Sequence, residues 1–351
     1  MIEGRSLDVE VTRRCNLRCD YCFVGWSRDW VTDLPEDVAR AVIDEGAGLF
    51  PMLHFTGGEP FAYRPLLGLV ERGLARGYER VLINTNGTFL TSDVVARLAA
   101  FGERVAITVS LDGPEPIHDR ARGKGRFREA DEGLARALEA GVPASVMVVV
   151  TPEVLRELSS FVTSLVRRHP RLRSVTLFPV GVGASGSQKP GIALRSLTPD
   201  EVRQMVLAVA LLFRTGVPIG IGAYPIANPM LRALGYPEAR LYQCTAGRGR
   251  ACVHADLSVS SCHPVKDPIY GKWRPGLLRE LATFAAHAQL SARDFEGCTT
   301  CGHRESCGHC RAFVTSNGAP LLGNDGACLD LLPIADRPKM KPPKRSLPIV
   351  G

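Results

Sequence analysis

The sequence predicts an α/β protein built on a parallel sheet that closes part of a barrel, followed by a smaller cysteine-rich domain. From residue 7 to about residue 222, short runs of β-branched residues alternate with stretches of helical periodicity. Conspicuous polar motifs directly follow the first four predicted strands. Eight of the eleven cysteines lie between Cys244 and Cys328, where the alternation has faded. Together these observations predict a parallel barrel and a metal-binding extension.

The repeated unit of the barrel is a strand followed by a helix. The predicted strands are Leu7–Thr12, Met52–Thr56, Arg80–Asn84, Val105–Leu111, Ala144–Thr151 and Ser174–Pro179. Stretches of helical periodicity include Glu36–Leu49, Pro65–Arg76, Ser92–Phe101, Arg128–Ala140 and Pro152–Arg168. Six strand–helix units are fewer than the eight of a closed barrel, so we expect a partial (β/α)6 barrel.

Three segments follow from this pattern. Residues 1–222 form the barrel, residues 223–334 form the cysteine-rich domain, and residues 335–351, rich in Pro and Lys, form a solvated tail. The cysteine-rich segment has few large apolar residues, so we expect bound metal to supply part of its folding energy.

The composition indicates in which compartment the protein is located and which classes of partner it binds. No export signal precedes the first strand, and the longest apolar run, Met205–Phe213, is too short to cross a bilayer, which predicts a cytoplasmic protein with no membrane partner. Cytoplasmic thiols stay reduced, so the cysteines are expected to bind metal rather than to form disulfides. Cluster-bound thiolates would cancel most of the formal charge of +7, so that charge is no argument for nucleic acid.

The loop after the first strand carries three cysteines, Cys15, Cys19 and Cys22. Three thiolates on a cubane of four irons leave one iron with an open coordination position, which a catalytic site requires. On this motif alone, a zinc knuckle with a distant fourth ligand is the alternative. The next strand is followed by Gly57-Gly58-Glu59-Pro60, and glycines let backbone approach a ligand closely.

The two motifs, in this order, resemble the cluster-binding and cofactor-binding motifs of the radical S-adenosylmethionine (SAM) superfamily. The resemblance covers the whole barrel. It implies that Cys15, Cys19 and Cys22 hold a 4Fe-4S cluster whose open iron binds the amino and carboxylate groups of SAM. A one-electron donor such as flavodoxin or ferredoxin would then reduce the cluster, SAM would be cleaved to a 5′-deoxyadenosyl radical, and that radical would take a hydrogen atom from the substrate.

The same resemblance implies SAM contacts in three loops. Gly57, Gly58 and Glu59 would receive the SAM amino group, and Tyr21 would pack near the adenine. The motif Asn84-Thr85-Asn86-Gly87 follows the third strand.

The fourth strand is followed by Ser110-Leu111-Asp112-Gly113 and then by His118-Asp119-Arg120-Ala121-Arg122. Ser110 resembles a ribose or carboxylate contact, and Arg122 resembles the arginine that pairs with the SAM carboxylate through its planar fork. The alternative for both residues is an ordinary surface role.

The cysteines beyond the barrel resemble the SPASM extension, which binds two auxiliary iron-sulfur clusters. The spacing Cys298-x2-Cys301-x5-Cys307-x2-Cys310 departs from the usual pattern only in its last gap, x2 in place of x3. The resemblance implies one 4Fe-4S cluster held by Cys298, Cys301, Cys307 and Cys328. It implies a second held by Cys244, Cys252, Cys262 and Cys310. One or two structural zinc sites are the alternative.

Two residues near the predicted inner auxiliary cluster, Cys252 and His263, each have more than one possible role. If Cys252 is not a ligand, the cluster has an open iron for a substrate thiolate, or Cys252 itself donates a hydrogen atom. His263 follows Cys262 directly and is either a catalytic base or a structural histidine. Trp26, Arg28 and Trp30 line the cavity or cover the rim, and a core or lid role is expected for Tyr63, Tyr224 and Tyr242.

The resemblance makes a peptide or protein side chain the expected substrate, oxidised or crosslinked through a thioether or carbon-carbon bond. The barrel begins almost at Met1, which leaves no room for an N-terminal leader-binding domain. Dehydrogenation of a small molecule such as a sugar or aminocyclitol is therefore the second hypothesis. A non-catalytic iron-sulfur or zinc protein is the third, and it has no use for an open iron.

Overall fold

A computed structural model describes residues 5–24, 32–181, 195–237, 241–242, 245–246, 249–264 and 270–283, and the single residues 301, 303, 307 and 310. Its centre is a nine-stranded sheet with the order β7-β6-β5-β4-β3-β2-β1-β8-β9. The strands are β1 Ser6–Thr12, β2 Met52–Gly57, β3 Arg80–Thr85, β4 Val105–Ser110, β5 Ala144–Val150, β6 Val175–Pro179, β7 Ile219–Ile221, β8 Arg250–Val253 and β9 Val259–Ser260. All neighbouring strands are parallel except β8 and β9.

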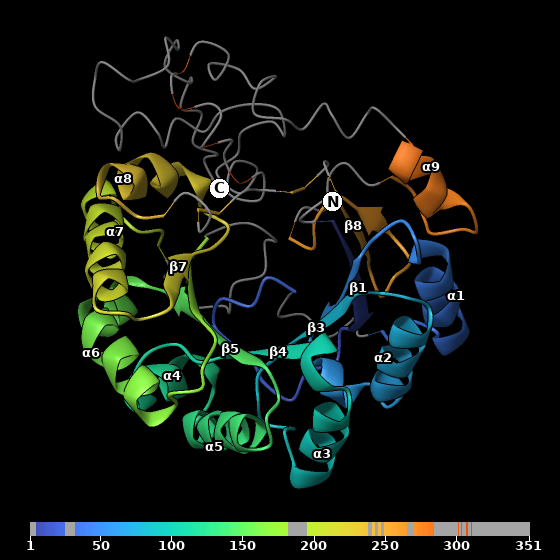
Figure 1. Ribbon diagram of the computed structural model, residues 1–351, viewed down its shortest axis with the longest axis horizontal. Helices are drawn as coiled ribbons and strands as arrows, with labels where there is room; N and C mark the ends of the chain where they lie inside the picture. Colours follow the sequence, from blue (N-terminus) through green and yellow to red (C-terminus); the bar gives the residue numbers. More distant parts are fainter. Residues whose placement is uncertain are drawn as a thin grey trace, which may run out of the picture.

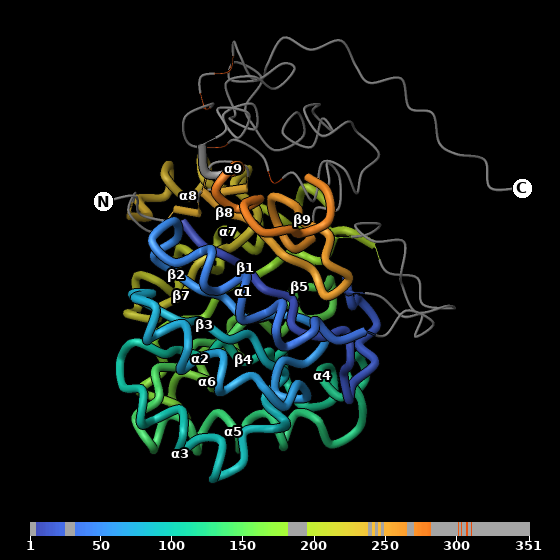
Figure 2. Tube along the Cα trace, turned by 90° about the vertical axis from the view of Figure 1, so that its right-hand side faces the viewer, coloured from blue at the N-terminus to red at the C-terminus, as the bar shows by residue number. Residues whose placement is uncertain are grey.

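Helices cover one side of the sheet. They are α1 Glu36–Gly46, α2 Leu66–Ala75, α3 Ser92–Ala100, α4 Glu115–Arg122, α5 Arg126–Glu139, α6 Pro152–Arg168, α7 Pro199–Arg214, α8 Asn228–Ala233 and α9 Leu277–Thr283. In Figure 1 the sheet bends into an open arc, with α1, α2, α3, α5, α6 and α7 around its outside. Figure 2 shows β8, β9 and α9 beside the β1 end of the arc. Within the described residues, no helix is long and apolar enough to span a membrane.

Alternation along β1 separates the two faces of the sheet. Leu7 faces α1, where a Cβ on Gly46 would come within 2.5 Å of its Cδ2, so its neighbours at even positions face the interior of the arc. Leu7, Val9 and Val11 are fully buried in the core between sheet and helices. Each such side chain contributes roughly 1.5–3 kcal/mol by leaving water. The inner face of β1 is polar, with Asp8 and Glu10 buried there.

The helices begin where the sequence supplies a cap. Thr91, Thr151 and Thr198 precede α3, α6 and α7, and each side chain accepts a hydrogen bond from the first turn of its helix. At α7 the side chain of Glu201 returns the bond to the backbone N–H of Thr198, which completes a capping box. These caps hold three outer helices against the strands that carry the site.

The α/β class and the six predicted strands are confirmed. The structure adds β7 to the parallel set, and β8 joins the sheet beside β1 although it lies within the segment 223–334. Both were missed because β7 has only three residues and β8 reads Arg-Ala-Cys-Val, without a β-branched run. The tail 335–351 lies outside the described residues, and the domain limits stay predictions.

Candidate active site

The three cysteines of the first motif lie on one folded loop after β1. The backbone N–H of Asp20 donates to Ala121 O of α4 at 3.0 Å, and the N–H of Cys22 donates to Cys19 O at 3.2 Å. The N–H of Leu17 donates to Cys15 Sγ at 3.3 Å. The loop is therefore fixed by its own backbone and by α4.

The thiols lie close enough together for their charges to interact. The pKa of Cys15 is raised to about 11, chiefly by burial and also by the nearby Glu59 and Cys22, against the hydrogen bonds that it accepts. Burial raises the pKa of Cys19 to about 12, with Cys22 and Cys15 again contributing. Cys15 and Cys19 therefore need a cationic partner to become thiolates together, which is what a metal cluster provides. The donor set fits an iron cubane.

The glycines after β2 are required by the approach of the cysteine segment itself. The N–H of Gly58 donates to Thr12 O at 2.7 Å. A Cβ on Gly57 would lie 2.3 Å from Thr12 O, and one on Gly58 would lie 2.3 Å from Arg14 O. The predicted contact of these glycines with SAM stays a prediction, and their absent side chains already serve this backbone contact.

Glu59 is fully buried and joins the loops after β2 and β3. Its Oε1 accepts from Thr85 Oγ1 at 2.8 Å and from the Phe61 N–H at 3.1 Å. Its Oε2 accepts from the Asn86 N–H at 2.7 Å, and the Asn86 amide in turn reaches Cys15 Sγ at 3.8 Å. Burial raises the pKa of Glu59 to about 7 in spite of these hydrogen bonds. A carboxyl poised near neutrality thus stands behind the cysteine loop.

Asp112 organises the loop after β4. Its carboxylate accepts from Tyr21 Oη and Arg122 Nε, and from the Val149 N–H of β5 at 2.7 Å. Burial alone would raise the pKa of Asp112, but Arg122 beside it holds that pKa below its usual range. Arg122 also directs Nη1 at Cys19 Sγ, 3.9 Å away.

This arrangement bears on three predicted SAM contacts. Tyr21 and Arg122 are brought together, with the guanidinium 5.7 Å from the ring centroid, and Ser110 is buried at the end of β4. Asp112 was noted only as part of a motif. The signal that it mattered was a carboxylate directly after a buried strand.

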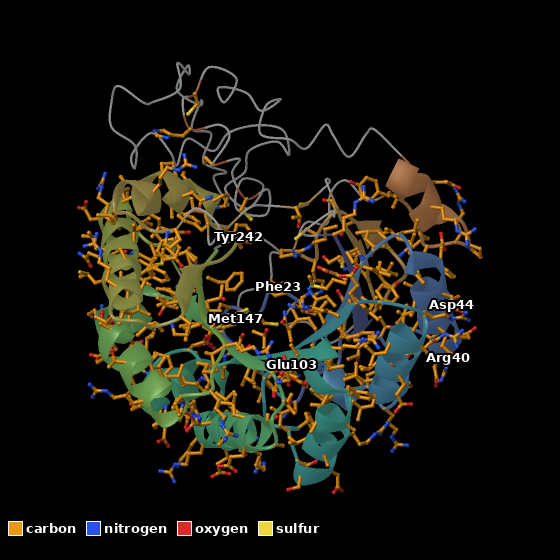
Figure 3. The ribbon with its side chains drawn as sticks, viewed as in Figure 1. Phe23, Arg40, Asp44, Glu103, Met147 and Tyr242 are labelled. Carbon is orange, nitrogen blue, oxygen red and sulfur yellow. The ribbon has the colours of Figure 1, made fainter. Side chains whose placement is uncertain are left out.

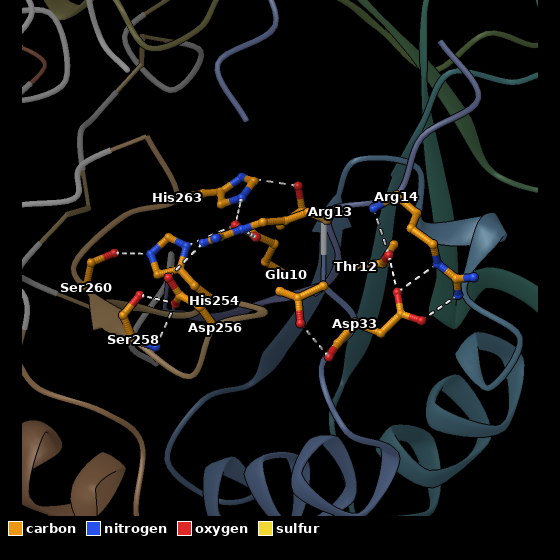
Figure 4. Close-up of polar contacts among 12 residues, drawn as sticks. Glu10, Thr12, Arg13, Arg14, Asp33, His254, Asp256, Ser258, Ser260 and His263 are labelled. Carbon is orange, nitrogen blue, oxygen red and sulfur yellow. Dashed lines mark hydrogen bonds and ion pairs between the residues drawn. The ribbon is translucent and has the colours of Figure 1, made fainter. Parts of the chain in front are cut away.

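A second polar group surrounds His263, which is buried. Its Nε2 lies 2.7 Å from Glu10 Oε2, and its Nδ1 lies 3.3 Å from Thr56 Oγ1 (Figure 4). His254 Nδ1 lies 3.0 Å from the same Glu10 oxygen. Burial lowers the pKa of His263 against the pull of Glu10, whereas hydrogen bonds from both imidazoles hold the pKa of Glu10 well below its usual range in spite of burial. Glu10 and His254 were not singled out from the sequence.

Phe23 links this group to the cysteine loop. It follows Cys22 directly, and its ring meets the His263 ring edge-on with centroids 4.9 Å apart. Figure 3 shows Phe23 and Met147 inside the arc, whereas Arg40 and Asp44 lie outside it on α1. The cysteine loop and the His263 group therefore face the same interior.

Comparison with known proteins places these features in a family. The model of the radical SAM superfamily matches residues 9–165. Mycofactocin maturase MftC of Mycolicibacterium smegmatis is 28% identical over 348 residues, which cover 95% of this chain and 85% of that protein. Fe-coproporphyrin III synthase of Methanosarcina barkeri is 29% identical over 199 residues, 56% of this chain and 48% of that protein. Residues 9–165 of this chain therefore match the radical SAM superfamily.

Solved structures share its fold. The structure titled native anSMEcpe with bound AdoMet has a TM-score of 0.70 at 19% identity, covering 93% of this chain and 94% of that one. Streptococcus suis SuiB bound to precursor peptide SuiA also has a TM-score of 0.70, at 16% identity, covering 92% and 75%. These structures confirm the predicted fold.

The family implies a 4Fe-4S cluster and SAM, and the residues of this chain fit them. The thiols of Cys15, Cys19 and Cys22 would hold the cluster, and Arg122 offers a cation beside Cys19. A zinc knuckle at these cysteines would give no role to the hydrogen bonds of Glu59 and Asp112 that surround the loop.

The auxiliary-cluster cysteines are only partly described. Cys252 on β8 is fully buried, and burial raises its pKa well above the usual value, with Asp8, Glu10 and Cys262 adding to the effect. The Cys307 N–H donates to His303 O at 2.9 Å, and the His303 N–H donates to Cys301 Sγ at 3.5 Å. Like Cys310, the cysteines named here are thiols rather than disulfides.

The structure describes only some of the other predicted residues. Cys244, Cys298, Cys328, Trp26, Arg28 and Trp30 lie outside the described residues, so the ligand sets stay predictions. Tyr63 donates to Leu34 O at 2.8 Å and belongs to the core, as expected.

Proposed function

We propose that this chain is a radical SAM oxidoreductase of the SPASM type that removes a hydrogen atom from a peptide or protein side chain. The observation that carries the proposal is that Cys15, Cys19 and Cys22 share one loop, with Asn86 beside Cys15 Sγ and Arg122 beside Cys19 Sγ. When bound, the cluster and SAM supply a 5′-deoxyadenosyl radical that abstracts the hydrogen atom. The chain's own residues supply position, charge and exclusion of water.

The roles at the SAM end follow from the contacts. Arg122 presents an N–H beside one of the three proposed cluster ligands, where the SAM carboxylate needs a cationic donor. Asp112 holds that guanidinium and the Tyr21 hydroxyl together. Ser110, Gly57, Gly58 and Glu59 are the remaining proposed contacts. Burial of Glu59 and Arg122 supports a pocket that excludes water.

The roles at the substrate end rest on the SPASM resemblance. The substrate radical would lose one electron to an auxiliary 4Fe-4S cluster and one proton to His263, which completes a two-electron oxidation. Each turnover would also consume one SAM and one electron from a donor such as flavodoxin or ferredoxin, and the electron received by the auxiliary cluster would leave to a one-electron acceptor. Cys244, Cys252, Cys262 and Cys310 are proposed for the inner auxiliary cluster. Cys298, Cys301, Cys307 and Cys328 are proposed for the outer one.

Relatives support a peptide as the substrate class. The relative that matches 95% of this chain is a maturase, and two of the solved structures with this fold contain peptides, SuiA and Kp18Cys. Fe-coproporphyrin III synthase matches 56% of this chain, against 95% for the maturase, which favours the peptide over a small-molecule substrate.

The experiment compares candidate substrates on the anaerobically reconstituted full chain. With dithionite and SAM, 5′-deoxyadenosine release is measured in the presence of a candidate precursor peptide and, separately, of sugars and aminocyclitols. We expect the peptide to accelerate release at least tenfold and to lose two hydrogens by mass. Acceleration by a polyol with formation of a ketone, and none by any peptide, would overturn the peptide assignment.

A further inference from the structure

Glu10, His254 and His263 form a compact buried group, here called the Glu10 triad. One ligand atom from each residue can be chosen so that all three lie within 4.8 Å of one another. Glu10 Oε2 stands between the imidazoles, 3.0 Å from His254 Nδ1 and 2.7 Å from His263 Nε2. Figure 4 shows the two rings on the same side of Glu10, and their centroids are 5.6 Å apart.

The far nitrogen of each imidazole is held by a hydroxyl group. His254 Nε2 lies 2.8 Å from Ser260 Oγ, and His263 Nδ1 lies 3.3 Å from Thr56 Oγ1. Ser260 is itself oriented because its hydroxyl donates to Cys262 O at 2.9 Å. Imidazoles that bind metals are oriented in this way, with the second ring nitrogen bonded to an outer group.

The contacts of the two imidazoles leave the centre of the triad to a cation. The near nitrogens, His254 Nδ1 and His263 Nε2, both face the same oxygen of Glu10. A metal ion there would bind these two nitrogens while the far nitrogens keep their hydroxyl partners.

The charges around the triad balance before a cation binds. Arg13 donates through Nε to Glu10 Oε1 at 2.5 Å, and its Nη2 lies 3.1 Å from Asp256 Oδ2. Lys272 Nζ lies 3.8 Å from Asp256 Oδ1, so two cations face two carboxylates when the imidazoles are neutral, and no excess positive charge opposes a dication. Glu10 Oε2 is the oxygen that this ion pair does not use.

We propose that Glu10, His254 and His263 bind one divalent cation of the Zn²⁺ class. Two imidazoles and one carboxylate are a known ligand set for zinc, and three protein ligands leave a fourth position open. That position would take water or an oxygen atom of the substrate. A bound cation would occupy His263 Nε2. The proton acceptor would then be the ligand in the open position instead of His263.

The proposed cation is separate from the clusters because it uses none of the cysteines. On one side of the cation lies the cysteine loop, whose Phe23 contacts His263. On the other side lies the segment that carries Cys262, whose carbonyl oxygen accepts from Ser260. Absence of the cation would leave the proposed radical chemistry intact, with His263 as the proton acceptor.

The test measures zinc on the full-length protein, prepared anaerobically with its clusters and equilibrated with Zn²⁺. Element analysis should give about one zinc per chain beside the iron, and zinc K-edge absorption should show only nitrogen and oxygen neighbours at about 2.0–2.1 Å. Sulfur neighbours at about 2.3 Å would instead indicate zinc in cysteine sites. Absence of zinc, or a sulfur shell alone, would overturn the proposal on the unmodified protein.

Variants then locate the zinc. Glu10→Gln and His254→Gln should each lower bound zinc at least tenfold with the iron content unchanged. His169→Gln is the matched control, because His169 is also buried and pairs with a carboxylate, Asp131, at 2.9 Å elsewhere on the barrel. It should keep its zinc. Retention of zinc by His254→Gln would contradict the assignment.

Discussion

At the scale of single residues, Asp112 connects more of the site than any sequence motif indicated. It joins Tyr21 of the cysteine loop, Arg122 of α4 and the backbone of β5, and its own N–H donates to His118 Nδ1 at 3.1 Å. Arg122 is 8% exposed, so it has little access to water if this partner is removed. The carboxylate of Asp112 thus positions the guanidinium of Arg122 and neutralises its buried charge.

Asp112→Ala should therefore lower the free energy of unfolding of the metal-free protein by about 3–5 kcal/mol, because Arg122 would be left buried and unpaired. Urea denaturation measures this. Glu153→Ala is the control: Glu153 pairs with Arg120 on the surface, where loss of an ion pair costs at most about 1 kcal/mol. Equal losses in the two variants would show that the Asp112–Arg122 pair is not the buried anchor described here.

Glu59 makes the free energy of unfolding depend on pH. Its folded-state pKa of about 7 lies above its ordinary value of 4.5, so between these values the folded protein keeps a proton that the unfolded chain releases. Stability should then fall as pH rises through this window. Between pH 5 and 7.5 the wild type should lose about 2 kcal/mol more than Glu59→Gln, measured by urea denaturation of the metal-free proteins. Parallel pH profiles would contradict this account of Glu59.

At the scale of elements, the junction of β1 and β2 positions the cysteine loop. The N–H groups of Gly58 and Glu59 bond to Thr12 O and Arg14 O at 2.7 and 2.8 Å, immediately before Cys15. The contact is between backbones, so it cannot relax by moving a side chain.

Gly58→Ala should displace the cysteine loop, because its Cβ would lie 2.3 Å from Arg14 O. We expect this variant to lose at least tenfold in 5′-deoxyadenosine formation and to bind about four fewer irons per chain. Gly68→Ala is the matched control in α2, where the nearest atom to a new Cβ is 4.0 Å away, and it should behave as wild type. A Gly58→Ala protein with full iron and full activity would show that the junction does not set the loop.

The sequence predicted those elements whose signal is local. Runs of β-branched residues and stretches of helical periodicity located β1 to β6, and the helices α1, α2, α3, α5 and α6, to within a few residues. The cysteine loop and the glycine motif were found because each is continuous in sequence. The Glu10 triad could not be found in this way, because Glu10 and His254 are separated by 244 positions and meet only when β8 pairs with β1.

At the scale of the whole molecule, one edge of the sheet gathers the chemistry. The loops after β1, β2, β3 and β4 meet there, because the carboxyl ends of parallel strands lie at the same edge. Pairing of β8 with β1 brings Cys252, and with it the Cys262–His263 segment, into the same interior. Resemblance to a family, rather than any local pattern, was needed to predict that this edge binds SAM.

The whole chain should carry about twelve irons after anaerobic reconstitution, if all three proposed clusters form. Replacing Cys15, Cys19 and Cys22 together by Ala should remove about four of them and leave the auxiliary clusters in place. Iron analysis measures both. About four irons with sulfur-bound zinc in the wild type would instead indicate one cluster and a structural zinc domain.

The central claim is that Cys15, Cys19 and Cys22 hold a cluster that cleaves SAM. It is tested most directly by measuring 5′-deoxyadenosine after dithionite and SAM are added to the reconstituted full chain and to Cys19→Ala. We expect the wild type to form at least one 5′-deoxyadenosine per chain and Cys19→Ala to form none above background. A fully iron-loaded wild type that forms no product, or a Cys19→Ala protein that forms as much as wild type, would contradict the account.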